Sequence, residues 1–157
     1  MNKVMKELNG NEENLAVVIA DIDSFKSIND TFNHIIGDGV IQHFAKLLQK
    51  HTASCDYVFR TGGEEFTLIL RNKTYEECLI FLGQLRDTIL DTPVETEFRS
   101  KTVNIPYTAS FGMYYIQKDN RMELKKAYMK ADELLLEAKH NGKNKIISQN
   151  SSLNKLK

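Results

Sequence analysis

The sequence predicts a single α+β domain built on a central antiparallel sheet. Three observations favour this fold class: short apolar runs of strand length, two long segments with the spacing of amphipathic helices, and the pair Gly62-Gly63 between two strand-like runs. A chain of 157 residues is long enough to bury a sizeable core in one domain. Hydrophobic residues make up 41% of the chain and charged residues 27%, which is the balance of a soluble globular protein.

Charge and cysteine content exclude several classes of function. The 21 Lys and Arg residues balance the 21 Asp and Glu residues, so no overall basic field favours binding to nucleic acid. No apolar run reaches the length of a membrane span, and the N-terminus lacks the profile of a signal peptide. Cys55 and Cys78 have no metal-binding spacing and are interpreted as reduced, buried thiols. We therefore expect a cytoplasmic domain that makes no membrane contact of its own.

The elements of the first half follow from where apolar residues cluster. Residues 15–20 are apolar at every position, as expected for a strand buried on both faces. Asp23 or Ser24 is a suitable N-cap for a short helix. In order, we expect a helix over residues 1–8, a polar loop over 9–14, a strand over 15–20, a short helix over 24–29, a longer helix that begins near 37–38, and strands over 55–60 and 66–70.

Two amphipathic helices dominate the second half. Apolar residues recur there in steps of three and four, and Asn141-Gly142 is a suitable stop for the second helix. Gly112 lies inside a strand pattern, which indicates a bulge or a close backbone approach. In order, we expect a helix over residues 74–90, an irregular strand over 94–104, a strand over 107–117, a helix over 122–140, a strand over 145–148, and a polar disordered tail over 149–157.

The segment 60–66 carries the most informative pattern. A Gly-Gly pair between two strand-like runs predicts a tight hairpin, because both central residues can adopt positive φ without steric cost. The adjacent carboxylates of Glu64 and Glu65 would repel each other by about 4 kcal/mol at about 4 Å and an effective dielectric constant of about 20. A bound cation is the simplest reason for such a pair at a hairpin tip. Asp21 and Asp23 supply a second acidic cluster at the end of the first apolar run.

A longer set of motifs resembles the GGDEF domain of diguanylate cyclases, in its GGEEF variant. The matches keep the family's order and spacing from about Met1 to Ile147, so we take residues 1–148 as one domain of this type. The matching residues are Asp21-Ile22-Asp23-Ser24-Phe25-Lys26-Ser27-Ile28-Asn29-Asp30, His34, Gly37-Asp38, Gly62-Gly63-Glu64-Glu65-Phe66, Thr108-Ala109-Ser110-Phe111-Gly112, Ala131-Asp132, Ala138-Lys139, Gly142 and Asn144.

The resemblance implies both a fold and a reaction. The family builds a five-stranded, mainly antiparallel sheet flanked by helices, similar to the polymerase palm and to class III nucleotide cyclases. It joins two GTP molecules into cyclic di-GMP and releases two pyrophosphates. The implied cofactor is Mg²⁺, with Mn²⁺ as an alternative, held by the Asp21 carboxylate, the Ile22 carbonyl and Glu64. The implied catalytic acids are Glu64 and Glu65, of which Glu65 assists the metal or removes the proton of the 3′-hydroxyl. Without the resemblance, Asp21 is equally well interpreted as a helix cap, and Glu65 as a solvated strand residue.

The same resemblance assigns the nucleotide contacts. Asn29 and Asp38 match the residues that read guanine, and His34 matches a substrate-contacting position. An amide and a carboxylate are able to pair with the purine edge, although each is also a common helix cap, and a lone histidine is often structural. The implied phosphate contacts combine a helix start with three lysines that would otherwise be solvated: Phe25, Lys26, Lys139 and Lys143.

The chain departs from the family pattern at four positions. The family's inhibitory Arg-x-x-Asp motif aligns with residues 53–56, so Ala53 replaces the arginine and Asp56 is retained. Without the guanidinium group we expect weak or no product inhibition. Lys143 replaces the usual arginine and offers a point charge in place of a planar fork. The remaining changes are Leu136 for tyrosine and Asn33 for glycine.

The resemblance also implies partners. One site holds one GTP, so turnover requires a second protomer that faces the first about a twofold axis, and an isolated monomeric fragment should bind GTP and react slowly. Only Asn2-Lys3 matches the end of the family's usual opening segment, which indicates an excised output domain or an unusual N-terminus. We expect a sensor domain upstream, and any membrane anchor of the full-length protein before Met1. The alternative is a catalytically silent module that binds GTP or cyclic di-GMP.

Overall fold

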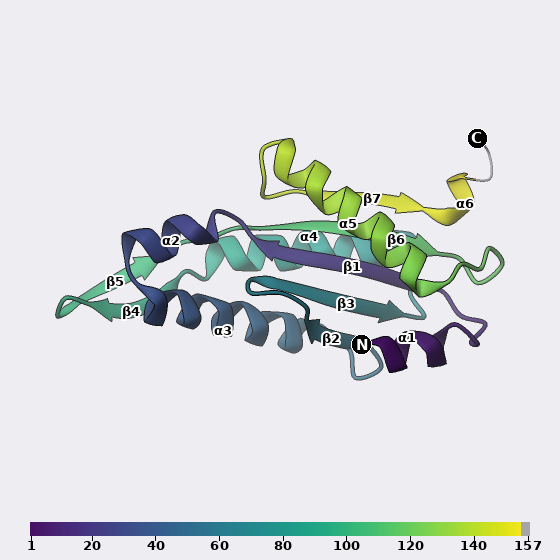
Figure 1. The fold of residues 1–157 in the computed structure, drawn as a ribbon, viewed down its shortest axis with the longest axis horizontal. Coiled ribbons are helices and arrows are strands. Elements are labelled where there is room, and N and C mark those ends of the chain that lie inside the picture. The colour runs from purple at the N-terminus through teal and green to yellow at the C-terminus, as the bar shows by residue number, and fades with distance from the viewer. Residues whose placement is uncertain (155–157) are drawn as a thin grey trace.

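A five-stranded sheet forms the centre of the computed structural model, which describes residues 1–154 (Figure 1). The helices are α1 (Asn2–Leu8), α2 (Phe25–Thr31), α3 (His34–His51), α4 (Tyr75–Asp91), α5 (Leu124–His140) and α6 (Ser151–Asn154). The strands are β1 (Leu15–Ile22), β2 (Tyr57–Arg60), β3 (Glu65–Arg71), β4 (Val94–Phe98), β5 (Lys101–Ile105), β6 (Ala109–Ile116) and β7 (Ile146–Asn150). The strand order is β2-β3-β1-β6-β7, and only the β6–β7 pair is parallel. The predicted five-stranded, mainly antiparallel α+β fold is confirmed.

Helices cover both faces of the sheet. Alternate residues of β1 point to opposite faces, so Val18 and Ile22 pack with α3 and α4, while Val17 and Ile19 pack with α1 and α5. This two-sided burial explains why the sequence of β1 is apolar at nearly every position. Gly112 of β6 lies under α5, where a Cβ atom would overlap the Ala131 carbonyl oxygen and the Leu135 backbone nitrogen. The predicted close backbone approach at this glycine is therefore confirmed.

Two expected elements have different bounds in the structure. α3 begins at His34 and not near residue 37, because the Asn33 side chain accepts a hydrogen bond from the Ile36 backbone N–H at 2.9 Å and caps the helix there. Residues 94–104 form two strands, β4 and β5, which pair only with each other. Arg99 and Ser100 make the turn between them with φ of 53° and 64°.

The C-terminal segment is more ordered than the sequence predicts. β7 extends to Asn150 and α6 follows, so the expected disordered tail is wrong for residues 149–154; residues 155–157 lie outside the described part. The backbone there is held by polar contacts: the Gln117 backbone N–H donates to Ser151 Oγ at 3.2 Å, and Asn120 Nδ2 donates to the Ser151 carbonyl at 2.6 Å. Buried polar partners of this kind are not visible in a local hydropathy pattern.

Two smaller expectations also need correction. Gly62 and Gly63 do lie in a hairpin between β2 and β3, but neither has positive φ; the turn closes through Thr61 N and Gly62 N, which donate to the Glu65 carbonyl at 3.0 Å and 3.1 Å. Cys78 is buried as expected, whereas Cys55 is exposed in the loop before β2. Within residues 1–154 no helix combines the length and the apolar character needed to cross a membrane.

Candidate functional site

The end of β1 and the start of β3 bring four predicted site residues together. We call Asp21, Ile22, Glu64 and Glu65 the acidic edge. Asp21 is the register partner of Glu65, and the Ile22 backbone N–H donates to the Glu64 carbonyl at 3.3 Å. The antiparallel pairing therefore places the strand end and the hairpin side by side, as the sequence predicted.

The ammonium group of Lys139, on α5, lies among the oxygens of this edge. Its Nζ atom donates to Asp21 Oδ1 at 2.9 Å and to Asp23 Oδ1 at 2.7 Å. It also contacts the carbonyl oxygens of Ile22 at 3.2 Å and of Asp21 at 3.4 Å. Carboxylate and carbonyl oxygens that converge on one positive charge are a donor set that suits Mg²⁺. Within the described residues no cluster of three or more His, Cys, Asp or Glu side chains could hold a metal, so the fit rests on this mixed set.

The pKa values of Asp21 and Asp23 are shifted in opposite directions by their surroundings. Burial raises the pKa of Asp21, and the negative charges of Glu64 and Glu65 raise it further against the opposing hydrogen bond and charge of Lys139. Burial alone would also raise the pKa of Asp23. There, however, hydrogen bonds to the carboxylate outweigh burial, and the pKa of Asp23 falls below its ordinary value. The surroundings of Asp21 therefore disfavour its negative charge, whereas the surroundings of Asp23 stabilise the negative charge of that carboxylate.

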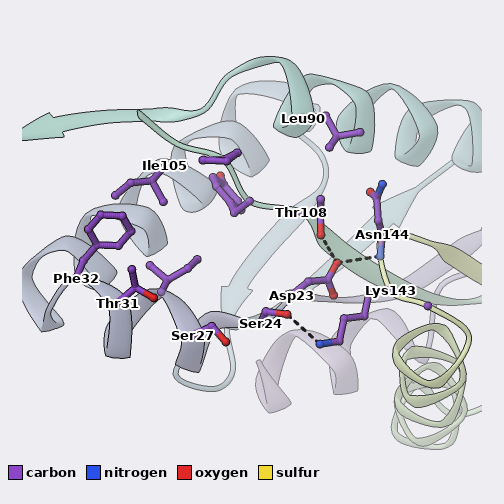
Figure 2. A pocket seen from close by; sticks show the side chains of 14 residues that line it. Asp23, Ser24, Ser27, Thr31, Phe32, Leu90, Ile105, Thr108, Lys143 and Asn144 are labelled. Atoms are coloured by element: carbon purple, nitrogen blue, oxygen red, sulfur yellow. Dashed lines mark hydrogen bonds between the residues drawn. The ribbon is translucent and has the colours of Figure 1, made fainter. Parts of the chain in front are cut away.

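Asp23 is a site residue whose role the sequence did not reveal. The sequence assigned it only to an acidic cluster and to a possible helix cap, yet the N-cap of α2 is Ser24, whose side chain makes no capping hydrogen bond. Its buried carboxylate instead accepts four hydrogen bonds, three of them from outside α5, and Figure 2 shows two of these. The donors are Thr108 Oγ1 at 2.6 Å, Ser110 Oγ at 2.7 Å, Lys139 Nζ at 2.7 Å and the Asn144 backbone N–H at 2.9 Å. The only signal in the sequence was that Thr108, Ser110 and Asn144 belong to motifs that had no assigned role.

The predicted guanine-reading residues lie where α2 packs on α3. Asn29 is half-buried against Gly37, since a Cβ atom at residue 37 would overlap Asn29 Oδ1. That oxygen is buried and has no hydrogen-bond partner. Asp38 follows Gly37 directly and is exposed. An unpaired amide oxygen and an exposed carboxylate can recognise a base that has several N–H donors. His34, at the start of α3, is exposed, and no contact places it with Asn29 and Asp38.

The predicted phosphate contacts are only partly assembled. Lys143 Nζ donates to Ser24 Oγ at 2.9 Å and so lies beside the start of α2 (Figure 2). The ring of Phe25 packs toward Gly37, and Lys26 is exposed. Lys139 lies at the acidic edge, where the metal was expected, so its contact with phosphate stays a prediction.

Asp56 has a structural role at the position of the inhibitory motif. Its side chain is fully buried and accepts hydrogen bonds from the backbone N–H groups of Ala53 and Arg71 at 2.9 Å and 3.0 Å. Lys73 Nζ lies 2.9 Å and 3.0 Å from its two oxygens. The carboxylate is thus already engaged by protein groups, in addition to lacking the arginine partner replaced by Ala53.

Arg60 is a second contributor that the sequence did not reveal. Its guanidinium group donates to the carbonyl of Gly63 at 2.8 Å and 3.2 Å and to the carbonyl of Gly62 at 3.3 Å. Gly63 has open space around the position of a Cβ atom, so neither φ nor packing within the chain requires a glycine there. Arg60 fixes the hairpin tip while the tip stays free of side chains, which leaves room for a ligand close to the backbone.

A family model and several known proteins are similar to this chain over most of its length. A family model described as "Diguanylate cyclase, GGDEF domain" matches residues 1–145. Uncharacterized membrane proteins of Staphylococcus haemolyticus and Staphylococcus epidermidis are each 29% identical over 147 residues, which cover 94% of this chain. The chain spans only 40% of the length of these relatives.

Solved structures share the fold. The GGDEF domain of DgcB from Caulobacter crescentus, in complex with c-di-GMP, superposes with a TM-score of 0.82 at 24% identity and covers 93% of this chain and 84% of that one. The active GGEEF domain of a diguanylate cyclase from Vibrio cholerae has a TM-score of 0.75 at 28% identity, with 94% and 88% covered. Diguanylate cyclase SiaD from Pseudomonas aeruginosa, in complex with its activator SiaC, has a TM-score of 0.81 at 26% identity, with 94% and 56% covered.

Proposed function

Since the chain belongs to the family of GGDEF diguanylate cyclase domains, we propose that it condenses two GTP molecules into cyclic di-GMP and two pyrophosphates. The observation that carries this proposal is the position of Lys139 Nζ within 3.4 Å of the oxygens of Asp21, Ile22 and Asp23. Those oxygens gather around a positive charge supplied by the protein. A site of this composition can accept a divalent cation in exchange.

Each residue of the acidic edge has a distinct role in this proposal. Asp21, the Ile22 carbonyl and Glu64 would hold Mg²⁺ or Mn²⁺, which when bound stabilises the attacking 3′-hydroxyl and the leaving pyrophosphate. Glu65 accepts a hydrogen bond from Thr61 Oγ1 at 3.0 Å, so its carboxylate is oriented by the hairpin. From there it assists the metal or accepts the proton of the 3′-hydroxyl.

The nucleotide contacts divide between base and phosphates. Asn29 supplies a buried amide oxygen that lacks a partner, and Asp38 an exposed carboxylate one residue beyond the glycine on which Asn29 packs. Together they match the N–H donors on the guanine edge, and His34 is assigned a minor substrate contact. Lys143 and Lys139 supply the positive charge for the triphosphate, with Phe25 and Lys26 at the start of α2.

Turnover further requires a second copy of the chain. One acidic edge serves one GTP, whereas the product contains two guanosine units joined through two phosphodiesters. Two protomers must therefore face each other so that each 3′-hydroxyl meets the α-phosphate of the other nucleotide. The staphylococcal relatives are named membrane proteins and are longer than this chain, so we also propose that this domain works on the cytoplasmic side as the output of a longer protein whose other region pairs the domains.

Incubation with GTP and Mg²⁺, followed by chromatography of the nucleotides, tests the proposal. We expect cyclic di-GMP to form at a specific activity that rises with protein concentration. The Glu64→Ala variant should make no product yet unfold at the wild-type denaturant concentration. Glu76→Ala, which removes an exposed acid on α4, should keep full activity and serves as the matched control.

Three outcomes would contradict parts of this scheme. An active Glu64→Ala variant would show that the metal assignment is wrong. A specific activity independent of concentration, from a protein that sedimentation shows to be monomeric, would refute the facing-protomer requirement. Binding of GTP or cyclic di-GMP without product, even at high protein concentration, would identify the chain as the silent regulatory module.

A further inference from the structure

A cavity of about 640 Å³ lies beside α2 and is lined in part by Asp23, which shares Lys139 with Asp21 of the acidic edge (Figure 2). Its walls come from α2, from the end of α4, from the β5–β6 connection and from the turn after α5. This volume is in the range of pockets that bind small molecules. None of the metal-binding, base-reading or catalytic roles proposed above uses its apolar part.

The walls are apolar and the floor is polar. Ile28 of α2 and Phe32, which follows α2 as its C-cap, line the cavity together with Ile105 and Leu90, and Figure 2 labels the last three. Ile105 is buried, whereas Leu90 lies at the rim and is 45% exposed. A ligand that fills this space would therefore bury an aromatic or aliphatic body against these side chains.

Charge at the floor favours an anion. The charged residues that line the cavity are Asp23 and Lys143. The carboxylate of Asp23 already accepts four hydrogen bonds, one of them from Lys139, so its charge is balanced. Lys143 is exposed, and within residues 1–154 its ammonium group contacts only a neutral partner, Ser24 Oγ at 2.9 Å. The ammonium group of Lys143 is therefore left to pair with an anionic group of a ligand.

The floor also contains an unmet hydrogen-bond acceptor. The amide oxygen Oδ1 of Asn144 is buried and has no partner, while the backbone N–H of the same residue is held by Asp23. Figure 2 shows this amide pointing away from Asp23 and in the direction of Leu90. A buried acceptor without a donor is unfavourable, so a ligand that brings an N–H or O–H group to it gains a contact that the free protein lacks.

We propose that this cavity is a second ligand site, specific for a small aromatic anion that carries one hydrogen-bond donor. The ring body packs on Ile28, Phe32 and Leu90, the anionic group binds Lys143, and the donor binds Asn144 Oδ1. Because Lys143 is also assigned to the triphosphate, the ligand and GTP compete for one lysine. The competition with GTP rests on the proposed function, whereas the second ligand site does not.

Anilinonaphthalene sulfonate is a suitable probe, because it combines fused rings, one N–H group and one sulfonate. Its fluorescence is titrated with wild-type protein and with rim variants that place an acid on either wall, Leu90→Asp and Thr31→Glu. Ile80→Asp is the matched control, since Ile80 is also on α4 and is 60% exposed but does not line the cavity. Circular dichroism verifies that each variant is folded.

We expect each rim variant to weaken binding of the dye by about tenfold or more, and Ile80→Asp to change it by less than about twofold. Phenylnaphthylamine, which has the same rings and N–H group without the sulfonate, should bind about tenfold more weakly than the sulfonate to the wild type. Equal weakening by Ile80→Asp, or equal affinity for the two dyes, would overturn the proposal.

Competition is measured separately by adding GTP and Mg²⁺ to the dye complex. We expect the apparent affinity for the sulfonate to fall severalfold, and no fall at GTP concentrations that saturate a fluorescent GTP analogue would refute the shared lysine. A chain that binds the dye in the cavity but never makes cyclic di-GMP would refute the proposed function and leave the second site standing.

Discussion

Asp21 and Asp23 contact the same lysine, yet only the replacement of Asp23 by asparagine should lower the stability of the fold. Asp23 has a side chain that is 4% exposed and a carboxylate held by four donors. Asp21 has a side chain that is 21% exposed and a pKa raised by burial and by the neighbouring glutamates. The first charge stabilises the folded state, and the second is placed there at a cost in stability.

The magnitude follows from the contacts. Removing one partner of a buried, hydrogen-bonded ion pair typically costs about 3–5 kcal/mol. The amide that replaces the carboxylate would keep one oxygen as an acceptor for part of the donor set, so we expect Asp23→Asn to lower the free energy of unfolding by about 3 kcal/mol. In a chain of this length that corresponds to a fall in Tm of about 6–12 °C. Asp21→Asn removes a charge that its surroundings disfavour, so its free energy of unfolding should equal or exceed that of the wild type.

Urea unfolding at neutral pH measures both variants, and a pH series checks the cause. The pKa of Asp23 is lowered by folding, so its contribution is present above pH 3.8 and is lost as pH falls through the folded-state value below that. The gap between wild type and Asp23→Asn should therefore close only in strong acid. The pKa of Asp21 is raised, so any gain in Asp21→Asn should vanish as acid protonates the wild-type carboxyl. An Asp23→Asn variant as stable as the wild type, or equal losses in both variants, would refute this reasoning.

Three further predictions concern other parts of the molecule. Gly112→Ala should lower the free energy of unfolding by about 1–3 kcal/mol, because the new methyl group overlaps the α5 backbone. Gly83→Ala lies in open space within α4 and should raise the free energy of unfolding by about 0.5–1 kcal/mol. Denaturant titration compares the two variants. Asp56→Ala should destabilise the fold by about 3–5 kcal/mol, and cyclic di-GMP added to the wild-type reaction should not slow it; strong inhibition that this variant abolishes would contradict the structural role of Asp56. Lys139→Met should bind Mn²⁺ about tenfold more tightly in the absence of nucleotide, because the competing ammonium group is gone. Electron paramagnetic resonance measures this binding, and an unchanged affinity would show that the lysine and the metal use different oxygens.

Local sequence patterns predicted most of the fold. The apolar run in β1 and the helical spacing of α4 and α5 gave element types and approximate bounds, because each pattern reflects burial of a nearby surface. The pairing of β4 with β5 was missed because this hairpin stands apart from the central sheet and exposes alternate residues such as Glu95 and Glu97. The start of α3 was missed because Gly37 resembles a helix boundary, whereas its actual role is to leave space for Asn29.

The site was predictable only where contacts are local or belong to a recognised motif. The candidate metal ligands Asp21 and Glu64 were predicted from the two acidic clusters and the family resemblance. The role of Asp23 was not found, because its donors Thr108 and Asn144 lie 85 and 121 residues further along the chain. No periodicity reports which distant hydroxyl or backbone N–H will face a carboxylate, so such partners become visible only when β1, β6 and the turn after α5 are placed together in three dimensions.

Lys139 shows how the family pattern and the structure complement each other. The resemblance assigns this lysine to the triphosphate, and the structure places it between Asp21 and Asp23, 2.9 Å and 2.7 Å from their carboxylates. Both placements follow from one requirement, which is that the acidic edge must be neutralised at every stage. In the free protein the ammonium supplies that charge. A bound metal–nucleotide complex would supply it instead, and Lys139 would then be free to contact the phosphates. Asp23, which has the lowered pKa and three further donors, would keep its charge balanced throughout this exchange, and the start of α2 would therefore stay in place.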